Sequence, residues 1–343
     1  MYKVRPNIQA LTPYSTARDE YKGGDISVWL DANESPYDNG VNRYPDPHQK
    51  QLKRVIASLK GVTAEQLFLG NGSDEAIDLC FRIFCEPQED NVVAIAPTYG
   101  MYGVAAAINN VEVREVALDA PDFHLSTKKM LNAIDEHTRL MWICSPNNPT
   151  GNAFPLSQIE TLLQQFQGIV VVDEAYADFS FQGTALSLLS RYDNLIVLQT
   201  LSKAWGMAGL RLGLAFSSPA IAELFARVKY PYNINAPTQQ EVIHRLQTEA
   251  HDSHVEEVCE QRALLERTLP KLPCVKNVYP SDANFLLVRV TDPDGIYEAL
   301  VRKGIIVRNR TRVKGCEGCL RITVGTPQQN EQLIACLSQY PLS

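Results

Sequence analysis

Continuous apolar runs are the feature that most constrains the fold of this 343-residue chain. Short runs rich in valine and isoleucine predict strands at Val92–Ala96, Val111–Val116, Leu140–Cys144, Ile169–Val172, Leu195–Leu198 and Leu212–Phe216. Those at 92–96, 140–144, 169–172 and 195–198 are nearly continuous, without polar alternation. Such runs are typical of strands that are buried on both faces, as in a parallel sheet. Helical patterns separate several of them, at Asp74–Phe84, Leu156–Phe166 and Pro219–Lys229. The alternation predicts an α/β fold with a mostly parallel sheet flanked by helices.

The C-terminal third predicts a second, smaller α/β unit. A long helical pattern runs from His244 to Leu269. Strands are expected at Asn284–Val290, Ile305–Arg308 and Leu320–Val324, with helices at Pro293–Arg302 and Pro327–Leu337. We therefore predict a large domain over residues 45–240, and a small domain built from residues 1–44 and 241–343 with an N-terminal arm.

Composition excludes several classes of protein. Lysine and arginine total 32 against 39 acids, and a net charge of −7 makes nucleic acid a poor partner. No apolar run approaches the ~18 residues needed to cross a bilayer, and Met1–Tyr14 lacks the apolar core of a signal peptide. Eight cysteines are too few for a disulfide scaffold. We expect a cytoplasmic protein that binds small molecules and neither nucleic acid nor membrane.

Two charged residues follow apolar runs, where ligands bind in open α/β sheets. Asp173 ends the run at 169–172, and Lys203 lies among small and apolar residues after Leu198. Partial desolvation lowers the pKa of such a lysine and suits an amine nucleophile, although Lys203 taken alone is more readily explained as an exposed loop lysine. A pyridoxal phosphate site needs a lysine, a carboxylate for the ring nitrogen and a phosphate-binding site. Arg211 could supply a bidentate phosphate contact.

A glycine-rich turn predicts the rest of the phosphate site. Gly70–Glu75 opens a helical pattern, and a helix N-terminus presents free N–H groups to an anion. The alternative is that Ser73 or Asp74 is an ordinary helix N-cap. Thr200 and Ser202 place hydroxyls near Lys203.

These residues belong to motifs that resemble a known family. Asn148-Pro-Thr-Gly, Asp173-Glu-Ala-Tyr176 and Ser202-Lys203 occur in that order, and Arg211 follows the lysine by eight residues. Over essentially its whole length, the chain resembles the fold-type I, class II pyridoxal-phosphate-dependent aminotransferases. Further stretches resemble the subfamily that acts on histidinol phosphate, namely residues 11–14, 29–34, 43–46, 97–102 and 320–326.

The resemblance implies a role for each cofactor residue. Lys203 would form a Schiff base with pyridoxal 5'-phosphate and transfer the proton at the substrate carbon. Asp173 would pair with the ring nitrogen, Tyr176 and Asn148 would hydrogen-bond the ring oxygen, and Tyr99 would stack on the ring. The phosphate would be held by Ser73, Asp74, Thr200, Ser202 and Arg211, and by Tyr44 across a homodimer interface.

Substrate binding is implied in the same way. Arg321 would bind the acidic group of the substrate with Arg308 as its helper, and Tyr14 and Asn33 would lie near the imidazole. Independently of the resemblance, the segment from Arg302 to Cys316 holds six basic residues and no acid. This segment could attract doubly charged substrates to the site by electrostatic steering, or it could be a basic loop exposed to solvent. Because Arg308 ends an apolar run, we expect it in the site ahead of Arg310 and Arg312.

The implied reaction interconverts L-histidinol phosphate and 2-oxoglutarate with imidazole-acetol phosphate and L-glutamate, in a ping-pong sequence. A threonine-phosphate decarboxylase or an aromatic amino acid aminotransferase remains an alternative with the same cofactor. Another alternative is a non-catalytic ligand-binding protein with an aminotransferase-like fold, as in some regulators. Such a regulator would be expected to carry a DNA-binding segment, and the acidic net charge of the chain argues against DNA binding. We expect no metal site, since Cys316-Glu-Gly-Cys319 lacks a second ligand pair and His251-x-x-His254 lacks a metalloprotease glutamate.

Overall fold

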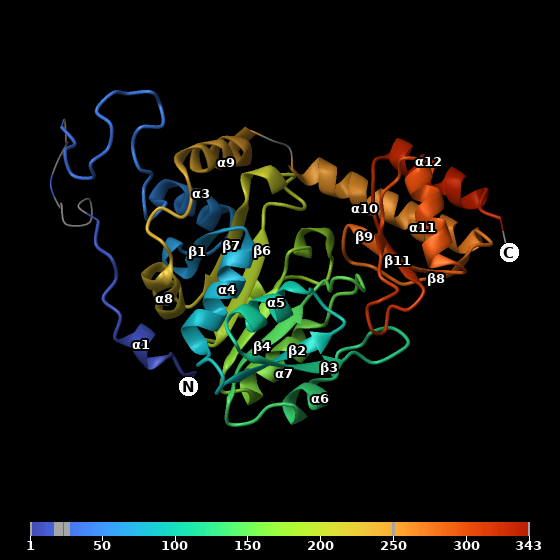
Figure 1. Cartoon of the computed structure of the whole chain (residues 1–343), viewed down its shortest axis with the longest axis horizontal. Helices are drawn as coiled ribbons and strands as arrows, with labels where there is room; N and C mark the ends of the chain where they lie inside the picture. Colours follow the sequence, from blue (N-terminus) through green and yellow to red (C-terminus); the bar gives the residue numbers. More distant parts are fainter. Residues whose placement is uncertain (1, 17–22, 24–27, 249–250, 342–343) are drawn as a thin grey trace.

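The chain is organised around two β-sheets, as seen in a computed structural model (Figure 1). The structure describes residues 2–16, 23, 28–248 and 251–341. Met1 and part of the predicted N-terminal arm, residues 17–22 and 24–27, lie outside these ranges. The larger sheet uses strands between residues 67 and 217, and the smaller one uses strands between residues 275 and 323.

The larger sheet has seven strands in the order β1-β7-β6-β5-β4-β2-β3. Its strands are β1 (Leu67–Asn71), β2 (Asn91–Ala96), β3 (Glu112–Ala117), β4 (Thr138–Cys144), β5 (Ile169–Asp173), β6 (Leu195–Thr200) and β7 (Leu212–Ser217). Strands β3, β2, β4, β5 and β6 pair in parallel, whereas β7 is antiparallel to both β6 and β1. The predicted mostly parallel sheet is thereby confirmed.

Side chains of the central strands alternate between two apolar clusters, one on each face of the sheet. In β4, Met141 and Ile143 join one cluster, while Leu140 and Trp142 join the other. In β5, Val170 and Val171 divide in the same way. Continuous apolar sequence is therefore required here, because neither face of these strands meets solvent.

Helices cover both faces of the larger sheet. One cluster includes side chains of α3 (Lys50–Lys60), α6 (Thr127–Asn132), α7 (Leu156–Gln165) and α9 (Ala236–Thr248). The opposite cluster includes side chains of α4 (Ser73–Phe84), α5 (Met101–Ile108) and α8 (Pro219–Val228), with Ile8 of α1 (Pro6–Gln9). The short 3₁₀ turns are Ala64–Gln66, Ala177–Phe179, Ala185–Leu188, Ala208–Leu210 and Leu269–Lys271.

The smaller sheet has four strands in the order β10-β11-β9-β8. They are β8 (Val275–Val278), β9 (Phe285–Val290), β10 (Arg308–Asn309) and β11 (Cys319–Thr323), all paired antiparallel. Side chains of α10 (His251–Thr268), α11 (Pro293–Arg302) and α12 (Pro327–Ser338) pack with these strands in a third apolar cluster.

Two predicted elements differ from the structure. The helical pattern over His244–Leu269 spans two helices, since α9 ends at Thr248 and α10 begins at His251. This stretch is rich in charged residues, so its sequence pattern does not mark where one helix ends and the next begins. The strand expected at Ile305–Arg308 is shifted and reduced to β10, since only Arg308 and Asn309 pair with β11. Within the described ranges, no helix is both long and apolar enough to cross a membrane.

At one edge of the larger sheet, the C-terminal ends of the parallel strands lie next to the start of the antiparallel strand β7. Strands β4, β5 and β6 end there with Cys144, Asp173 and Thr200. Because β7 is antiparallel, it begins at this edge, where Gly213 pairs with Thr200, and β1 ends opposite Leu212. The edge therefore lies next to the N-terminus of α4.

Candidate functional site

A cavity of about 350 Å³ opens at this edge of the larger sheet. It brings together most residues predicted for the site, namely Ser73, Asp74, Tyr99, Asn148, Asp173, Tyr176, Thr200, Ser202, Lys203, Arg211, Arg308 and Arg321. Gly72, Cys144, Ala175, Ala208 and Arg310 also line it. The cavity has the volume of a small-molecule site and polar groups from both sheets.

The N-terminus of α4 forms one wall of the cavity. Gly72 caps the helix with a φ of 77°, and a side chain on it would lie 2.5 Å from Nη2 of Arg211. A side chain on Gly213 would collide with the backbone of Gly72 and Ser73. The helix start can approach β7 and Arg211 this closely only because both positions are glycine. The first-turn N–H groups have no partner inside a helix, so this wall suits an anion.

Arg211 completes this wall. Its carbonyl accepts a hydrogen bond from the Gly72 N–H at 2.7 Å, and its backbone is left-handed with a φ of 54°. Nη2 of Arg211 lies 3.7 Å from the Asp74 carboxylate, which also accepts a 3.1 Å hydrogen bond from the Tyr99 hydroxyl. Arg211 is half-exposed here, so its guanidinium remains available to a ligand.

Asp173 lies at the floor of the cavity and is only 3% exposed. Burial raises its pKa, while hydrogen bonds from Tyr102 and the Ala175 N–H, and the nearby Lys203, act in the opposite direction. The Tyr102 hydroxyl donates to Oδ2 at 2.7 Å, and the Ala175 N–H donates to Oδ1 at 3.1 Å. A carboxylate held at the end of a buried strand can stabilise a positive charge on a ligand.

Lys203 extends into the open part of the cavity. Desolvation lowers its pKa, and the positive charges of Arg321 and Arg211 lower it further. Its Nζ lies 5.8 Å from the centre of the Tyr176 ring. Burial raises the pKa of the Tyr176 phenol, which therefore remains protonated and able to donate a hydrogen bond. A lysine with a lowered pKa is a stronger candidate for an amine nucleophile than an ordinary surface lysine.

Arginines from the smaller sheet form the opposite wall. Arg308 and Arg321 lie directly opposite each other on β10 and β11. Nη1 of Arg321 donates to Oδ1 of Asn148 at 2.5 Å, and its guanidinium lies over the ring of Phe285. Within the described part of the chain, no acid pairs with Arg308, Arg310 or Arg321, and the Nε atoms of Arg310 and Arg321 are buried without hydrogen-bond partners. Like charges placed together in this way are destabilising unless an anion neutralises them.

Arg310 lines the cavity together with Arg308, although the sequence interpretation placed Arg308 in the site ahead of it. Both arginines line the cavity, and Arg310 is the more buried of the two. Desolvation and the neighbouring Arg321 and Arg308 lower the pKa of Arg310. The sequence spacing of Arg308 and Arg310 could have predicted that both line the cavity, because residues two positions apart on an extended segment point to the same face.

Tyr14, Asn33 and Tyr44 do not line this cavity. Tyr44 stacks on Tyr232 with ring centres 4.4 Å apart and, with Asn33, lines a separate cavity of about 390 Å³. Tyr14 is 73% exposed. Their predicted roles therefore remain predictions, and the role given to Tyr44 already required a second copy of the chain.

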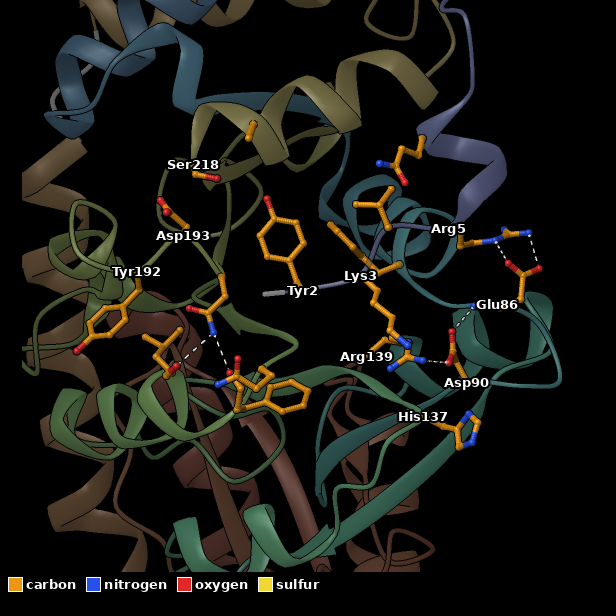
Figure 2. Close-up of a pocket in the computed structure, with 18 of the residues that line it drawn as sticks. Tyr2, Lys3, Arg5, Glu86, Asp90, His137, Arg139, Tyr192, Asp193 and Ser218 are labelled. Carbon is orange, nitrogen blue, oxygen red and sulfur yellow. Dashed lines mark hydrogen bonds and ion pairs between the residues drawn. The ribbon is translucent and has the colours of Figure 1, made fainter.

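A larger groove of about 1550 Å³ lies at the opposite edge of the same sheet (Figure 2). The N-terminal segment forms one side, and Arg5 and Arg139 pair there with Glu86 and Asp90. These charges are neutralised within the chain, and no predicted catalytic residue lines the groove. Size alone therefore does not make it the functional site.

Comparisons with known proteins agree over nearly the whole chain. A family model described as aminotransferase class I and II matches residues 17–337. The histidinol-phosphate aminotransferase of Bacteroides thetaiotaomicron is 54% identical over 338 residues, which cover 98% of this chain and 97% of the relative. That of Parabacteroides distasonis is 54% identical over 340 residues, which cover 99% and 98%.

Solved structures share the fold. The crystal structure of histidinol-phosphate aminotransferase from Sinorhizobium meliloti in complex with pyridoxal-5'-phosphate matches with a TM-score of 0.80 at 21% identity. The match covers 99% of this chain and 97% of that one. At this identity the likeness concerns the arrangement of the elements, whereas the cavity described above depends on the side chains of this chain.

Proposed function

The chain belongs to the class I and II aminotransferase family, and we propose that it is a pyridoxal-phosphate-dependent transaminase of histidine biosynthesis. It interconverts L-histidinol phosphate and 2-oxoglutarate with imidazole-acetol phosphate and L-glutamate. The observation that carries the proposal is the cavity itself, which joins Lys203 and Asp173 from one sheet to Arg321 and Arg310 from the other. The names of the relatives at 54% identity support the choice of substrate.

The residues of the cavity fit pyridoxal phosphate. The cofactor has a phosphate, an aromatic ring with a basic nitrogen, and an aldehyde. The start of α4 offers first-turn N–H groups beside Arg211 for a phosphate, and a Cβ atom at Gly72 or Gly213 would displace Arg211 or the helix start. Asp173 offers a buried carboxylate for the nitrogen, and Lys203 offers an amine for the aldehyde.

Each predicted cofactor residue has a specific task in this proposal. The backbone N–H groups of Ser73 and Asp74 bind the phosphate together with Thr200, Ser202 and Arg211. Tyr176 and Asn148 bind the ring oxygen, and Tyr99 lies against the ring. When bound, the cofactor supplies an electrophilic carbon and an electron-withdrawing ring.

Lys203 and Asp173 have separate roles in the proposed reaction. Lys203 Nζ would take the proton from the substrate carbon that bears the amine and would deliver it to the cofactor carbon bonded to the same nitrogen. Its lowered pKa leaves a larger fraction of the amine neutral and able to act as a base. The Asp173 carboxylate would pair with the ring nitrogen of the bound cofactor and keep that nitrogen protonated.

The arginine wall suits both amine donors. Glutamate presents a carboxylate and histidinol phosphate presents a phosphate, and a guanidinium can bind either group with two parallel hydrogen bonds. Arg321 binds the acidic group in each half-reaction, with Arg308 and Arg310 adding positive charge for the phosphate. Tyr14 and Asn33 would approach the imidazole from the N-terminal region.

The proposal also includes a homodimer in the cytoplasm. Exposed apolar side chains occur in and next to the N-terminal arm, namely Val28, Leu30, Tyr37, Val41 and Tyr44, and a second copy would cover them. Tyr44 then reaches the cofactor phosphate of the other subunit. All eight cysteines are free, which supports a reducing compartment. The division into domains at 45–240 and at 1–44 with 241–343 is part of the same proposal.

The first test is an absorption spectrum of the purified protein, before and after addition of L-histidinol phosphate without a keto acid. We expect a visible cofactor band that histidinol phosphate converts to the band of the aminated cofactor. Release of carbon dioxide from threonine phosphate, added in place of histidinol phosphate, would support the threonine-phosphate decarboxylase alternative. A band that responds only to aromatic amino acids would overturn the proposed substrate, and the absence of any band would overturn the cofactor.

A further inference from the structure

Tyr102 is a buried phenol to which neither the motifs nor the proposed reaction assigns a task. It lies on α5 and is 1% exposed. Its hydroxyl donates a 2.7 Å hydrogen bond to Oδ2 of Asp173, across the boundary between the helix layer and the sheet. Burial and the neighbouring Asp173 raise the pKa of this phenol well above its usual value, so it remains a donor at every working pH.

The ring of Tyr102 is held in place by other aromatic rings. It stacks on Trp142 of β4 with ring centres 4.7 Å apart, and Trp142 stacks on Phe81 of α4 at 5.5 Å. Tyr99 meets Tyr102 edge-on at 5.7 Å. Rings packed from three elements leave little freedom to the hydroxyl, which makes the hydrogen bond to Asp173 a fixed part of the fold.

This hydrogen bond opposes the effect of burial on Asp173. A buried carboxylate tends to take up a proton, and a protonated carboxyl would no longer form an ion pair with a ring nitrogen. Oδ1 already accepts from the Ala175 N–H, so the phenol gives the second oxygen a donor as well. With one donor on each oxygen, the plane of the carboxylate is set and its remaining lone pairs are available towards the cavity.

We propose that Tyr102 is a positioning residue that keeps Asp173 ionised and oriented towards the ring nitrogen of the cofactor. The proposal rests on the proposed function, because it requires pyridoxal phosphate in the cavity. Tyr102 touches neither substrate nor cofactor in this proposal and acts only through Asp173. Tyr102 belongs to the apolar cluster that includes α4, α5 and α8, and it does not line the cavity.

The test is Tyr102→Phe, which removes the hydroxyl and keeps the ring stack. Other titratable groups near Asp173 are unchanged by it, namely Asp74, Cys144, Tyr99, Tyr176 and Lys203. With the cofactor labelled at the ring nitrogen with ¹⁵N, the NMR shift reports whether that nitrogen carries a proton. We expect the variant's signal to move towards the neutral pyridine value, at a pH where the parent protein shows the protonated form.

Affinity gives a second readout. Loss of a hydrogen bond to a charged group is expected to raise the dissociation constant of pyridoxal phosphate about tenfold. In a protein that carries Asp173→Asn, the same Tyr102→Phe change is expected to have little further effect, because its target is gone. Such non-additivity separates action through Asp173 from a general effect on packing. Phe225→Leu is the packing control, because Phe225 lies in the same apolar cluster but stacks on Phe68 and not on Tyr102. It is expected to lower thermal stability without moving the ¹⁵N shift.

Two results would overturn the proposal while the proposed function stands. One is an unchanged ¹⁵N shift and cofactor affinity in Tyr102→Phe. The other is a loss of affinity that is equally large with and without Asp173→Asn. If the parent protein itself bound no pyridoxal phosphate, the proposed function would fail first, and the two failures are therefore distinguishable.

Discussion

Arg310 illustrates how a single side chain sets the charge of the site. Its Nε is buried without a hydrogen-bond partner, and it stands beside Arg308 and Arg321 with no paired acid in the described ranges. A phosphate monoester carries about 1.5 to 2 negative charges at pH 7, and a carboxylate carries about one. An additional arginine in the wall should therefore favour the phosphate substrate over glutamate.

We predict that Arg310→Gln raises KM for histidinol phosphate about tenfold and changes KM for glutamate less, as expected for loss of a charge-assisted hydrogen bond. Steady-state kinetics with each amine donor measures both values. Arg312→Gln is the matched control, because Arg312 is exposed and does not line the cavity. Equal losses for both donors would show that Arg310 does not distinguish phosphate from carboxylate.

Lys203 makes the stability of the cofactor-free protein depend on pH. Its pKa in the folded chain is lowered by desolvation and by Arg321 and Arg211, below the unfolded value of 10.5. In the interval between the two pKa values the unfolded chain binds more protons, so stability rises with pH there. The cost of the charged lysine is fully present below the folded pKa and disappears above the unfolded one.

Lys203→Met removes this cost. We predict that, without cofactor, the variant melts at a higher temperature than the parent protein near pH 7, and that the difference shrinks as the pH approaches 10.5. Thermal unfolding at a series of pH values measures it. A difference that is constant across the series would show that packing, not charge, separates the two proteins.

At the scale of elements, the phosphate site depends on the contact between β7 and the start of α4. Gly213 lies directly against the backbone of Gly72 and Ser73, and Gly213 pairs with Thr200 of β6. This contact aligns the first-turn N–H groups of α4 with the side chains that follow β6. Any Cβ atom at position 213 would push the helix start away from the sheet.

We predict that Gly213→Ala lowers stability by about 1–3 kcal/mol, as for an overpacked core, and also weakens binding of pyridoxal phosphate. Gly209→Ala is the control, since a Cβ atom there meets nothing within 4 Å. Thermal unfolding without cofactor and a cofactor titration are measured on both variants. If Gly213→Ala lost stability but bound the cofactor normally, the start of α4 would not be the phosphate site.

At the scale of the whole molecule, a single chain does not explain why the N-terminal arm exposes apolar side chains. Tyr44 stacks on Tyr232 away from the main cavity, and Leu30 and Tyr37 are each more than 80% exposed. A homodimer would cover these side chains and place Tyr44 in the other subunit's site. The arrangement can be tested with mixed dimers.

We predict that dimers formed from Tyr44→Ala and Lys203→Ala subunits regain activity that neither variant shows alone. In such a hybrid, one site combines an intact Lys203 with an intact Tyr44 from the other chain. Activity after unfolding and refolding of the mixture, with each variant refolded alone as control, is the measurement. If Tyr44 acted in its own subunit, every site in the hybrid would remain defective and no activity would return.

Most of the larger sheet could be predicted because its signal is local. A strand buried on both faces needs an apolar run such as Ile169–Val172, and the structure confirms strands at each such run. Strands β1 and β8 were not predicted. In β8 the burial pattern is intermediate and exposed, so no apolar run marks it, whereas β1 carries Gly70 within a short run.

The residues of the candidate site also fall into those that could be predicted from local sequence and those that could not. Lys203, Asp173 and Arg211 could be proposed from sequence because each occurs next to a strand end or within a recognisable motif, and the structure places all three around one cavity. Tyr102 lies in the stretch 97–102 that resembles the subfamily, but the resemblance gave it no role. Its meeting with Asp173 depends on how α5 packs against β4 and β5, which involves residues 71 positions apart.

Local sequence patterns were enough to identify the fold class, the family and the lysine at the centre of the proposed chemistry. These depend on short-range patterns, since burial of a strand and the order of motifs can be read within a few residues. The side chains that surround that lysine, in contrast, became known from the folded chain. The joining of Arg310 and Arg321 to Asp173 requires the smaller sheet to face the strand ends of the larger one, and such long-range contacts leave no mark in the local sequence.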